Sequence, residues 1–319
     1  MFRVLGFEFN VYHSMRNIFT IGETVFDILI KEGEVIAAKS GGAMLNTSVS
    51  LGRMNLPVQL ITEIGDDEIG RLITNFLSNN NVEINYLNKG NTQTSLAIAF
   101  LNEQNDASYS FYRASSEKRS DVTVPLIQPD TILLFGSSYA INKEVRPYLK
   151  KLLQLAKENK AIIIYDPNFR KAHLHELKTL MPLIEENLAF ANIVRGSDED
   201  FKNIAGVKKA EEAYKFVSRF GKSTLIFTSG GKSVKLLNAK IQLELKVKAV
   251  KTISTIGAGD GFNAGIIAAL IIHNVGYEDI RKVDFKLWEK ILGMGISFGS
   301  EVCKSYENYI SNYFAKSYY

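Results

Sequence analysis

The sequence predicts an α/β protein built on a doubly wound, mostly parallel sheet, with a smaller group of strands beside it. Two observations carry this prediction. Short apolar runs rich in Ile, Val and Leu alternate with helical stretches, and such continuous apolar strands are typical of a sheet buried on both faces. Two other stretches, 27–40 and 92–113, interleave polar and apolar residues and contain no crossover helix.

The elements follow in order along the chain. The predicted strands of the main sheet are 18–21, 58–64, 131–135, 161–165, 192–194 and 224–228. The predicted helices are 43–54, 67–78, 144–159, 174–187, 208–220, 258–273 and 285–303. The two polar-interleaved stretches, the second turning at 102–106, are expected to meet as a small antiparallel sheet. It is either a lid or an extension of the main sheet's edge, and the pattern alone favours neither.

Composition excludes several classes of protein. The chain of 319 residues has 38 Lys+Arg against 34 Asp+Glu, a net charge of +4. This excess of positive charge is too small for a protein that coats nucleic acid. The longest apolar run, Ala264 to Ile272, is well short of the ~20 residues of a membrane-spanning helix. One cysteine and four histidines without zinc spacing argue against disulfides and against a thiolate- or imidazole-held metal. We expect a cytoplasmic protein without nucleic-acid or membrane partners, in which oxygen-held Mg²⁺ is the candidate metal.

The most specific segment runs from Thr252 to Leu270, where a strand-like run enters a glycine turn that opens into an apolar helix. In that turn Gly257, Ala258 and Gly259 let backbone N–H groups converge at a helix N-terminus, which makes a physically sound anion site. Asp260 follows at once and would repel an anion unless it has a chemical task, such as general base. The alternative is an Asp that only complements the helix dipole.

A second polar segment surrounds the start of the first predicted helix. Gly41 and Gly42 permit close backbone approach to a ligand, and Asn46 offers a donor and an acceptor to a hydroxyl group. Asp27, after the first strand, is another candidate acceptor for hydroxyl hydrogen bonds. Polyol recognition is the natural use of this set. An Asp turn and an Asn near a helix N-terminus also explain the two polar residues separately.

These segments resemble the two signatures of the ribokinase-like (PfkB) carbohydrate kinases. The N-terminal signature is similar to 41–46 (Gly-Gly-Ala-Met-Leu-Asn) with 65–70, and the C-terminal signature to 255–262 (Thr-Ile-Gly-Ala-Gly-Asp-Gly-Phe). Between them, 166–170 (Asp-Pro-Asn-Phe-Arg) is similar to the family's DPNxR element. The resemblance runs from about residue 17 to the C-terminus, and two signatures in the right order make it specific.

The resemblance implies a three-layer α/β/α fold with a β-sheet lid. The large nucleotide- and sugar-binding domain would comprise 15–26, 41–91 and 114–319, the discontinuous lid 27–40 and 92–113, and an N-terminal extension 1–14. The implied activity is ATP-dependent transfer of the γ-phosphoryl group to a primary hydroxyl of a monosaccharide, with a fructose-like ketose favoured. The alternatives are a kinase for a sugar acid or a nucleoside, and a catalytically silent sugar-binding regulator.

The same resemblance implies roles for individual residues. Asp260 maps onto the catalytic base, and the backbone of Gly257, Ala258, Gly259 and Asp260 onto the anion hole. Sugar contacts map onto Asp27, Gly41, Gly42, Asn46, Arg113, Asn168 and Arg170. Arg113 is equally well read as an exposed arginine at a strand end. Nucleotide contacts map onto Ser197, Thr228, Gly230, Gly257 and Gly259, and Asp200 would orient a metal-bound water.

A few positions depart from the family pattern. Ser254 replaces the Asp of DTxGAGD, a residue associated with a monovalent-cation site, so activation by K⁺ stays open. Ser197 and Asp200 replace the usual Asn and Glu of the motif that organises Mg²⁺, and Asp200 has the shorter reach. None of these changes touches Asp260, so catalysis with MgATP is expected to survive. An exposed lid edge would favour a homodimer through strand pairing.

Overall fold

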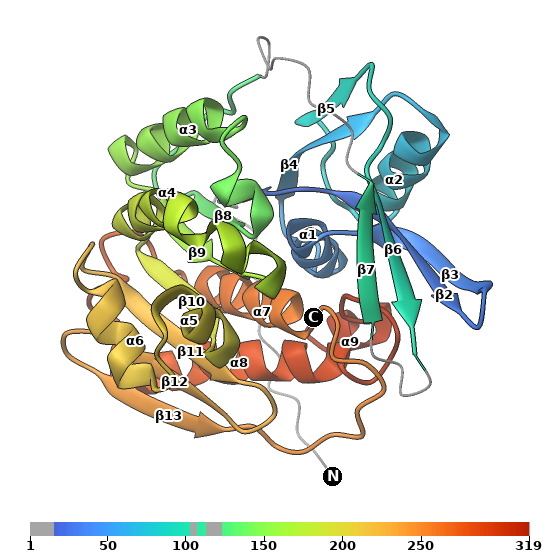
Figure 1. Ribbon diagram of the computed structural model, residues 1–319. Coiled ribbons are helices and arrows are strands. Elements are labelled where there is room, and N and C mark those ends of the chain that lie inside the picture. The colour runs from blue at the N-terminus through green and yellow to red at the C-terminus, as the bar shows by residue number, and fades with distance from the viewer. Residues whose placement is uncertain (1–15, 103–106, 113–122, 319) are drawn as a thin grey trace.

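The computed structural model describes residues 16–102, 107–112 and 123–318, and every structural statement below concerns these residues (Figure 1). The strands of its main sheet are β1 (Ile18–Ile21), β4 (Val58–Gly65), β5 (Leu87–Gly90), β8 (Ile132–Gly136), β9 (Ile162–Asp166), β10 (Ile193–Ser197), β11 (Thr224–Ser229), β12 (Ser233–Leu237) and β13 (Gln242–Lys246). Their order is β13-β12-β11-β10-β9-β8-β1-β4-β5. Neighbours from β11 to β5 pair parallel, and β12 and β13 are added antiparallel.

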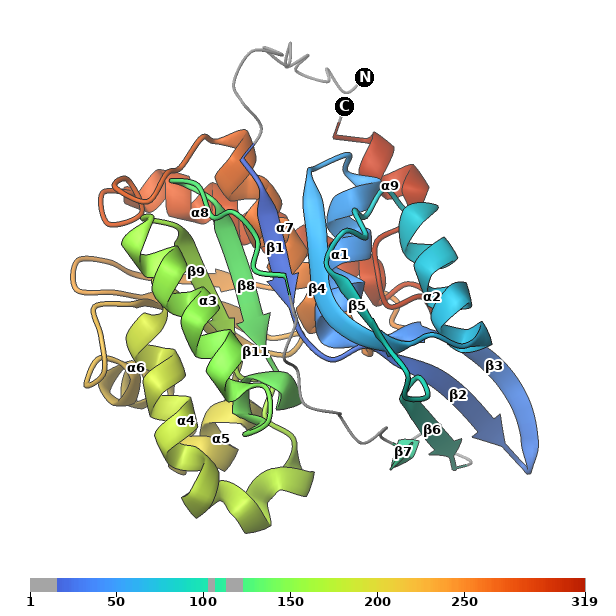
Figure 2. The same ribbon diagram turned by 90° about the horizontal axis from the view of Figure 1, so that it is seen from above.

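Helices cover both faces of this sheet, as the view from above shows (Figure 2). One face carries α1 (Ala43–Arg53), α2 (Glu68–Ser78), α7 (Ala258–Ile272), α8 (Phe285–Val302) and α9 (Asn312–Lys316). The other face carries α3 (Arg146–Glu158), α4 (Leu177–Phe190), α5 (Asp198–Ala205), α6 (Ala210–Val217) and the 3₁₀ helix η1 (Ser138–Ile141). Along β8 the side chains alternate between two cores, Ile132 and Leu134 on one face, Leu133 and Phe135 on the other. The predicted three-layer, doubly wound fold is confirmed.

A second sheet of four strands projects from the body of the molecule (Figure 1). It comprises β2 (Val25–Lys31), β3 (Glu34–Gly41), β6 (Leu96–Leu101) and β7 (Ala107–Tyr112), in the order β3-β2-β6-β7. It is a separate sheet and does not extend the edge of the main one. The prediction of antiparallel pairing is confirmed for the hairpins β2–β3 and β6–β7 but is wrong for the central strands β2 and β6, which pair parallel. Each follows a main-sheet strand, β1 or β5, and those strands run in the same direction.

Some predicted element boundaries differ from the structure. The predicted helix 174–187 begins as the 3₁₀ helix η2 (Lys171–Glu176) and continues as α4. The short helices α5 and α9 and the strand β5 are absent from the prediction. Helix α5 had a sequence signal, because Ser197 and Asp200 form a capping box at its start.

Two further expectations concern segments outside the described residues and the long apolar helix α7. The predicted extension 1–14 and the tip of the hairpin turn at 102–106, residues 103–106, lie outside the described residues. The long apolar helix α7 is packed in the core, where ten of its residues are buried. Across the described ranges, no helix is both long and apolar enough to traverse a lipid bilayer.

Candidate active site

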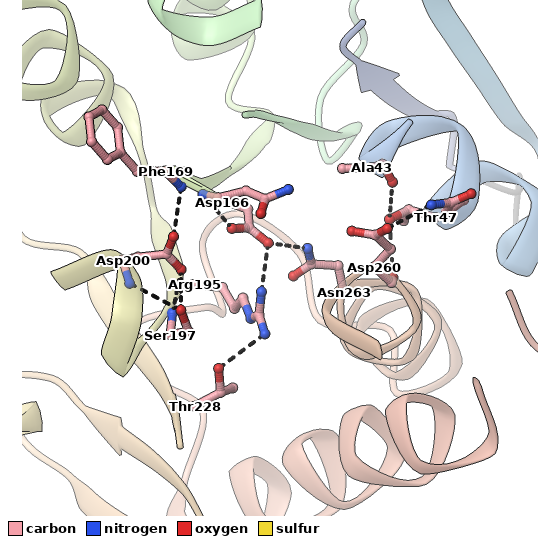
Figure 3. Close-up of polar contacts among 12 residues, drawn as sticks. Ala43, Thr47, Asp166, Phe169, Arg195, Ser197, Asp200, Thr228, Asp260 and Asn263 are labelled. Carbon is pink, nitrogen blue, oxygen red and sulfur yellow. Dashed lines mark hydrogen bonds and ion pairs between the residues drawn. The ribbon is translucent and has the colours of Figure 1, made fainter. Parts of the chain in front are cut away.

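The first turn of α7 lies at the centre of the candidate site (Figure 3). Its N-cap is Gly257, with φ 80°, and no side chain caps the helix. The N–H groups at the start of a helix have no carbonyl partner within it, and the helix dipole adds partial positive charge there. A Cβ on Gly257 would lie 2.4 Å from the carbonyl oxygen of Asn308, and one on Gly259 would lie 2.8 Å from Arg195 Nη1. Only glycine fits either position without displacing a neighbour.

Helix α1 holds Asp260 from the side. Asn46 Nδ2 donates a 2.8 Å hydrogen bond to Asp260 Oδ2, and Thr47 Oγ1 donates a 3.1 Å bond to the Asp260 carbonyl oxygen. Asn46 is buried, and within the described residues its Oδ1 has no hydrogen-bond partner. Buried polar atoms are normally paired, so this oxygen is suited to accept a hydrogen bond from a bound hydroxyl group.

The protonation of Asp260 is set by its surroundings. Burial raises the pKa of Asp260 to about 6, with a further rise from Asp166, while the Asn46 hydrogen bond and the charges of Arg170 and Arg195 oppose it. The side chain is only partly buried, so a substrate can reach it. A carboxylate with a pKa slightly below neutral is mostly ionised at pH 7 and suits a general base.

The two glycines before α1 make room for neighbours, Gly41 for the Asp27 side chain and Gly42 for the backbone of Glu23. Asp27 lies within β2, directly opposite Lys39 of β3, so its interpretation as part of a turn is wrong. A Cβ on Gly41 would lie 1.9 Å from Asp27 Oδ2. Gly42 has φ 122°, and a Cβ there would lie 2.4 Å from the carbonyl oxygen of Glu23. Burial raises the pKa of Asp27 to about 6, although the charge of Lys39 opposes the shift.

A buried polar network lies on the other side of the α7 turn (Figure 3). Asp166 Oδ2 accepts hydrogen bonds from Arg195 Nη1 at 3.0 Å and from Asn263 Nδ2 at 2.6 Å. Arg195 Nη2 donates to Thr228 Oγ1 at 3.0 Å. Burial lowers the pKa of Arg195, but Asp166 and the neighbouring carboxylates Asp200 and Asp260 outweigh it and raise the pKa. Asn263 lies one turn after Asp260, so this network supports the same helix end.

Asp200 fixes the loop that follows β9. Its Oδ1 accepts from the Phe169 N–H at 2.7 Å, and its Oδ2 accepts from the Ser197 N–H at 2.7 Å and the Ser197 hydroxyl at 2.6 Å. Asn168, beside Phe169, has φ 41°, and Arg170 is exposed. Most of the acceptor capacity of Asp200 is therefore used within the protein. Across the described residues no cluster of three His, Cys, Asp or Glu side chains is arranged to hold a metal ion.

The predicted residues fall into two groups that meet at α7. Asp27, Gly41 and Gly42 lie at the junction of the small sheet and the start of α1, and Asn46 of α1 is bonded to Asp260. Asn168, Ser197, Asp200 and Thr228 surround the network of Asp166 and Arg195, which contacts the turn at Gly259. Gly230, with φ 53°, lies exposed at the turn from β11 to β12, and Arg113 lies outside the described residues.

Three site residues are absent from the sequence-based set: Asp166, Arg195 and Asn263. Arg195 had a signal, because a charged side chain in a short apolar strand is rarely buried without a partner. Asp166 opens the DPNxR element, and Asn263 follows Asp260 at the helical spacing that places both on one face.

Comparisons with known proteins agree with this geometry. Residues 15–283 match the model of the pfkB family carbohydrate kinases. Fructokinase from Rhizobium leguminosarum bv. trifolii is 29% identical over 266 residues, which cover 80% of this chain and 79% of that protein. Fructokinase-1 from Oryza sativa subsp. japonica is 24% identical, with 82% of this chain and 83% of that protein covered.

Solved structures share the fold. The crystal structure of fructokinase from Vibrio cholerae O395 in its fructose-, ADP- and calcium-bound form has a TM-score of 0.81 at 21% identity, and covers 93% of this chain and 95% of that one. Since the family model spans most of the sequence, and since a carboxylate lies at an uncapped helix N-terminus, the chain belongs to the pfkB family of carbohydrate kinases and is an ATP-dependent carbohydrate kinase.

Proposed function

We propose that this kinase transfers the γ-phosphoryl group of ATP to a primary hydroxyl group of a fructose-like ketose. The observation that carries the proposal is the position of Asp260 in the uncapped first turn of α7, hydrogen-bonded to Asn46. Asp260 takes the proton from the sugar hydroxyl as the hydroxyl oxygen attacks the γ-phosphorus, and the bond from that phosphorus to the β,γ-bridging oxygen breaks, so that ADP leaves. The backbone N–H groups of Gly259 and Asp260 hydrogen-bond the phosphoryl oxygens as charge develops on them.

The sugar occupies the side of Asp260 that faces α1 and the small sheet. Asn46 Oδ1, which is buried with no hydrogen-bond partner in the described structure, accepts from one sugar hydroxyl, and Asp27 accepts from another. Asn168 and Arg170, on the loop fixed by Asp200, line the site from the opposite side. The small sheet acts as a lid, so that water is kept from competing with the sugar for the phosphoryl group.

The nucleotide lies along β10, β11 and the α7 turn, with Ser197, Thr228 and Gly230 beside it. Magnesium would be brought by the nucleotide as MgATP, and it would supply positive charge to the transferring phosphates. The donor set fits this mode of binding, because Mg²⁺ is commonly held by phosphates and waters with only one or two protein carboxylates. Asp200 retains some acceptor capacity for a metal-bound water, although the Phe169 and Ser197 groups already occupy three of its positions.

Relatives support the choice of sugar. Both sequence relatives described above carry the name fructokinase, and the Vibrio cholerae O395 structure contains fructose. Another fold neighbour, aminoimidazole riboside kinase from Salmonella enterica in complex with aminoimidazole riboside and an ATP analog, has a TM-score of 0.79 at 19% identity. A nucleoside-like substrate therefore belongs in the test.

The test is a substrate panel read as ADP release with MgATP. The panel contains fructose and other ketoses, aldoses, a keto-deoxy sugar acid and nucleosides, and Asp260→Asn is the matched inactive control. We expect turnover to be highest with fructose and absent in the control. Preferred turnover of the sugar acid or a nucleoside would replace the ketose assignment, and no turnover of any member would leave a silent binding protein. Repeating the assay in Na⁺ and K⁺ salts tests the cation question raised by Ser254.

We also propose a homodimer formed through the small sheet. Its two edge strands are β3 and β7, and they expose apolar side chains: Val35, Ile36, Phe111 and Tyr112. Unpaired strand edges with exposed apolar side chains favour pairing with another chain. Light scattering after gel filtration is expected to give twice the mass of the chain, and a monomer at all concentrations would contradict this.

A further inference from the structure

A segment after α8 connects the small sheet with the α7 turn. We call this segment, residues 303–310, the strap. At its start the Cys303 carbonyl oxygen accepts a 2.8 Å hydrogen bond from the Ile253 N–H, just before the turn. Further along, the backbone of Asn308 lies so close to Gly257 that a Cβ there would come within 2.4 Å of its carbonyl oxygen and 2.7 Å of its Cα. The strap therefore forms one wall of the turn that opens α7.

A lysine of the small sheet is bonded to the middle of the strap. Lys39 Nζ donates to the Tyr306 carbonyl oxygen at 2.5 Å and to Asn308 Oδ1 at 3.2 Å. Asn308 is buried, so its side-chain oxygen needs a donor. Burial lowers the pKa of Lys39, whereas the nearby carboxylates Glu307 and Asp27 oppose the shift and favour the charged ammonium.

The same lysine faces the proposed sugar site. In the register of β2 and β3, Lys39 is directly opposite Asp27, and side chains of directly opposed residues lie on the same face of a sheet. The Lys39 ammonium thus bonds the strap from the same face of the small sheet that carries the Asp27 carboxylate. Movement of the small sheet that displaces Asp27 also displaces the donor of both strap hydrogen bonds.

The far end of the strap is fixed by α1. Arg53 Nη1 donates to the Ile310 carbonyl oxygen at 2.8 Å, and the Ile310 N–H donates to Ser50 Oγ at 3.3 Å. The Arg53 guanidinium also lies 4.5 Å from the centre of the Tyr309 ring. Because α1 anchors one end and the body of α8 the other, the part of the strap most responsive to Lys39 is the part that touches Gly257.

We infer that Lys39 is a positioning residue, which holds the strap against the Gly257 turn and so couples the position of the small sheet to the geometry of the anion-binding turn. Its catalytic consequence rests on the proposed function: when the sugar sets the position of the small sheet, the N–H groups that receive the phosphoryl group are adjusted as well. The structural part, a Lys39-dependent order of the turn, stands without any substrate.

Hydrogen exchange of the ligand-free protein tests the structural part. We expect the amides of 253–261 to exchange about fivefold faster in Lys39→Met than in the wild type, because a charged hydrogen-bond donor is lost. Lys246→Met, an exposed lysine on β13, is the matched control and should change nothing in that segment. Lys39→Arg keeps a donor and should restore slow exchange. Unchanged exchange in Lys39→Met, or acceleration spread evenly over α3 and the core, would overturn the inference.

If Lys39→Met does not fold, Asn308→Ala provides the second variant, since it removes one acceptor and leaves the strap backbone in place. It should accelerate exchange in the same segment, and slow exchange there would count against the inference.

Enzyme kinetics test the catalytic consequence of the Lys39 contacts. With the preferred sugar as substrate, Lys39→Met should lower kcat about tenfold with little change in the KM for ATP. Lys39→Arg should recover most of the lost kcat. Full kcat in Lys39→Met with a fast-exchanging turn would reject the catalytic coupling. Failure of the proposed function is recognised separately, because the wild type would then phosphorylate no member of the panel while the exchange result still decides the role of Lys39.

Discussion

The side-chain amide of Asn46 donates a 2.8 Å hydrogen bond to Asp260 Oδ2, although 214 positions separate the two residues along the chain. The bond joins the first turns of α1 and α7, and it fixes the carboxylate from the side on which the sugar is proposed to bind. It also opposes the effect of burial, which raises the pKa of Asp260. Asn46 therefore both orients the base and moderates its proton affinity.

Replacing the base should remove activity and stabilise the fold. Asp260→Asn is expected to lower kcat by about 10³-fold, since proton transfer to a positioned group contributes ~10²–10⁴. Burial raises the pKa of Asp260 from 3.8 to about 6, so the native state loses stability as pH rises through that window, and the loss is complete at pH 7.

An uncharged side chain avoids that loss, which we place at about 1–3 kcal/mol for a partly buried group. ADP release and thermal unfolding at pH 7 measure the two effects, with a higher Tm expected for the variant. A lower Tm for Asp260→Asn at pH 7 would contradict the assignment of burial as the cause of the shift.

The pH profile should depend on two carboxylates. Burial raises the pKa of both Asp27 and Asp260 to about 6. Asp260 must be ionised to take a proton, and an ionised Asp27 accepts stronger hydrogen bonds from sugar hydroxyl groups. Below pH ~6, log kcat/KM for the sugar should fall with a slope approaching two, since two protons are taken up. In Asp27→Asn the slope should approach one, at a lower plateau. A slope of two in that variant would exclude Asp27 from the titration.

The space beside Gly41 should control sugar affinity. A Cβ on Gly41 would lie 1.9 Å from Asp27 Oδ2, so Gly41→Ala displaces that carboxylate. We expect the KM for the sugar to rise about tenfold or more while the KM for ATP changes little. Gly90→Ala on β5 is the control, because its Cβ would meet nothing closer than 3.6 Å. Equal effects on both KM values would indicate a general loss of structure.

Breaking the buried ion pair of Asp166 and Arg195 should lower the free energy of unfolding more than removing both charges does. In Arg195→Met the Asp166 carboxylate loses its charged partner, and breaking such a pair typically destabilises by about 3–5 kcal/mol. Asp166→Asn in the same chain removes the stranded charge. The double variant should therefore recover part of the free energy of unfolding lost in Arg195→Met, as measured by denaturant titration. Strict additivity of the two single variants would show that the residues act independently.

Much of the fold was predictable because its strands are continuous apolar runs between long helices. The strand β5 was not, since its sequence Leu-Asn-Lys-Gly is polar and it is recognised only by pairing with β4. The parallel pairing of β2 and β6 was likewise out of reach, because it depends on where two distant strands leave the main sheet. Sequence patterns reveal the periodicity of individual strands. They do not reveal whether two strands that are distant in the chain pair parallel or antiparallel.

The candidate site divides in the same way. Asp260, Gly41 and Asn46 carry local signals, a glycine turn into a helix and a glycine pair before one, so they were predictable. Asp166 and Arg195 lie on β9 and β10, and their ion pair exists because those strands are neighbours in the sheet. Polar groups that pair across strands are visible only when the strand order is known.

The parallel pair β2–β6 has a consequence for how the chain acquires its structure. Between these strands lies a complete unit of the main sheet, with α1, β4, α2 and β5, so their pairing closes a long loop. Such closure is slow until the intervening unit is formed. The hairpin β2–β3 leaves the ribosome early yet has no partner for its inner edge until β6 arrives. The small sheet is thus completed only once that unit has brought β6 beside β2, and because its strands come from two separate segments, no one deletion confined to them removes the whole sheet.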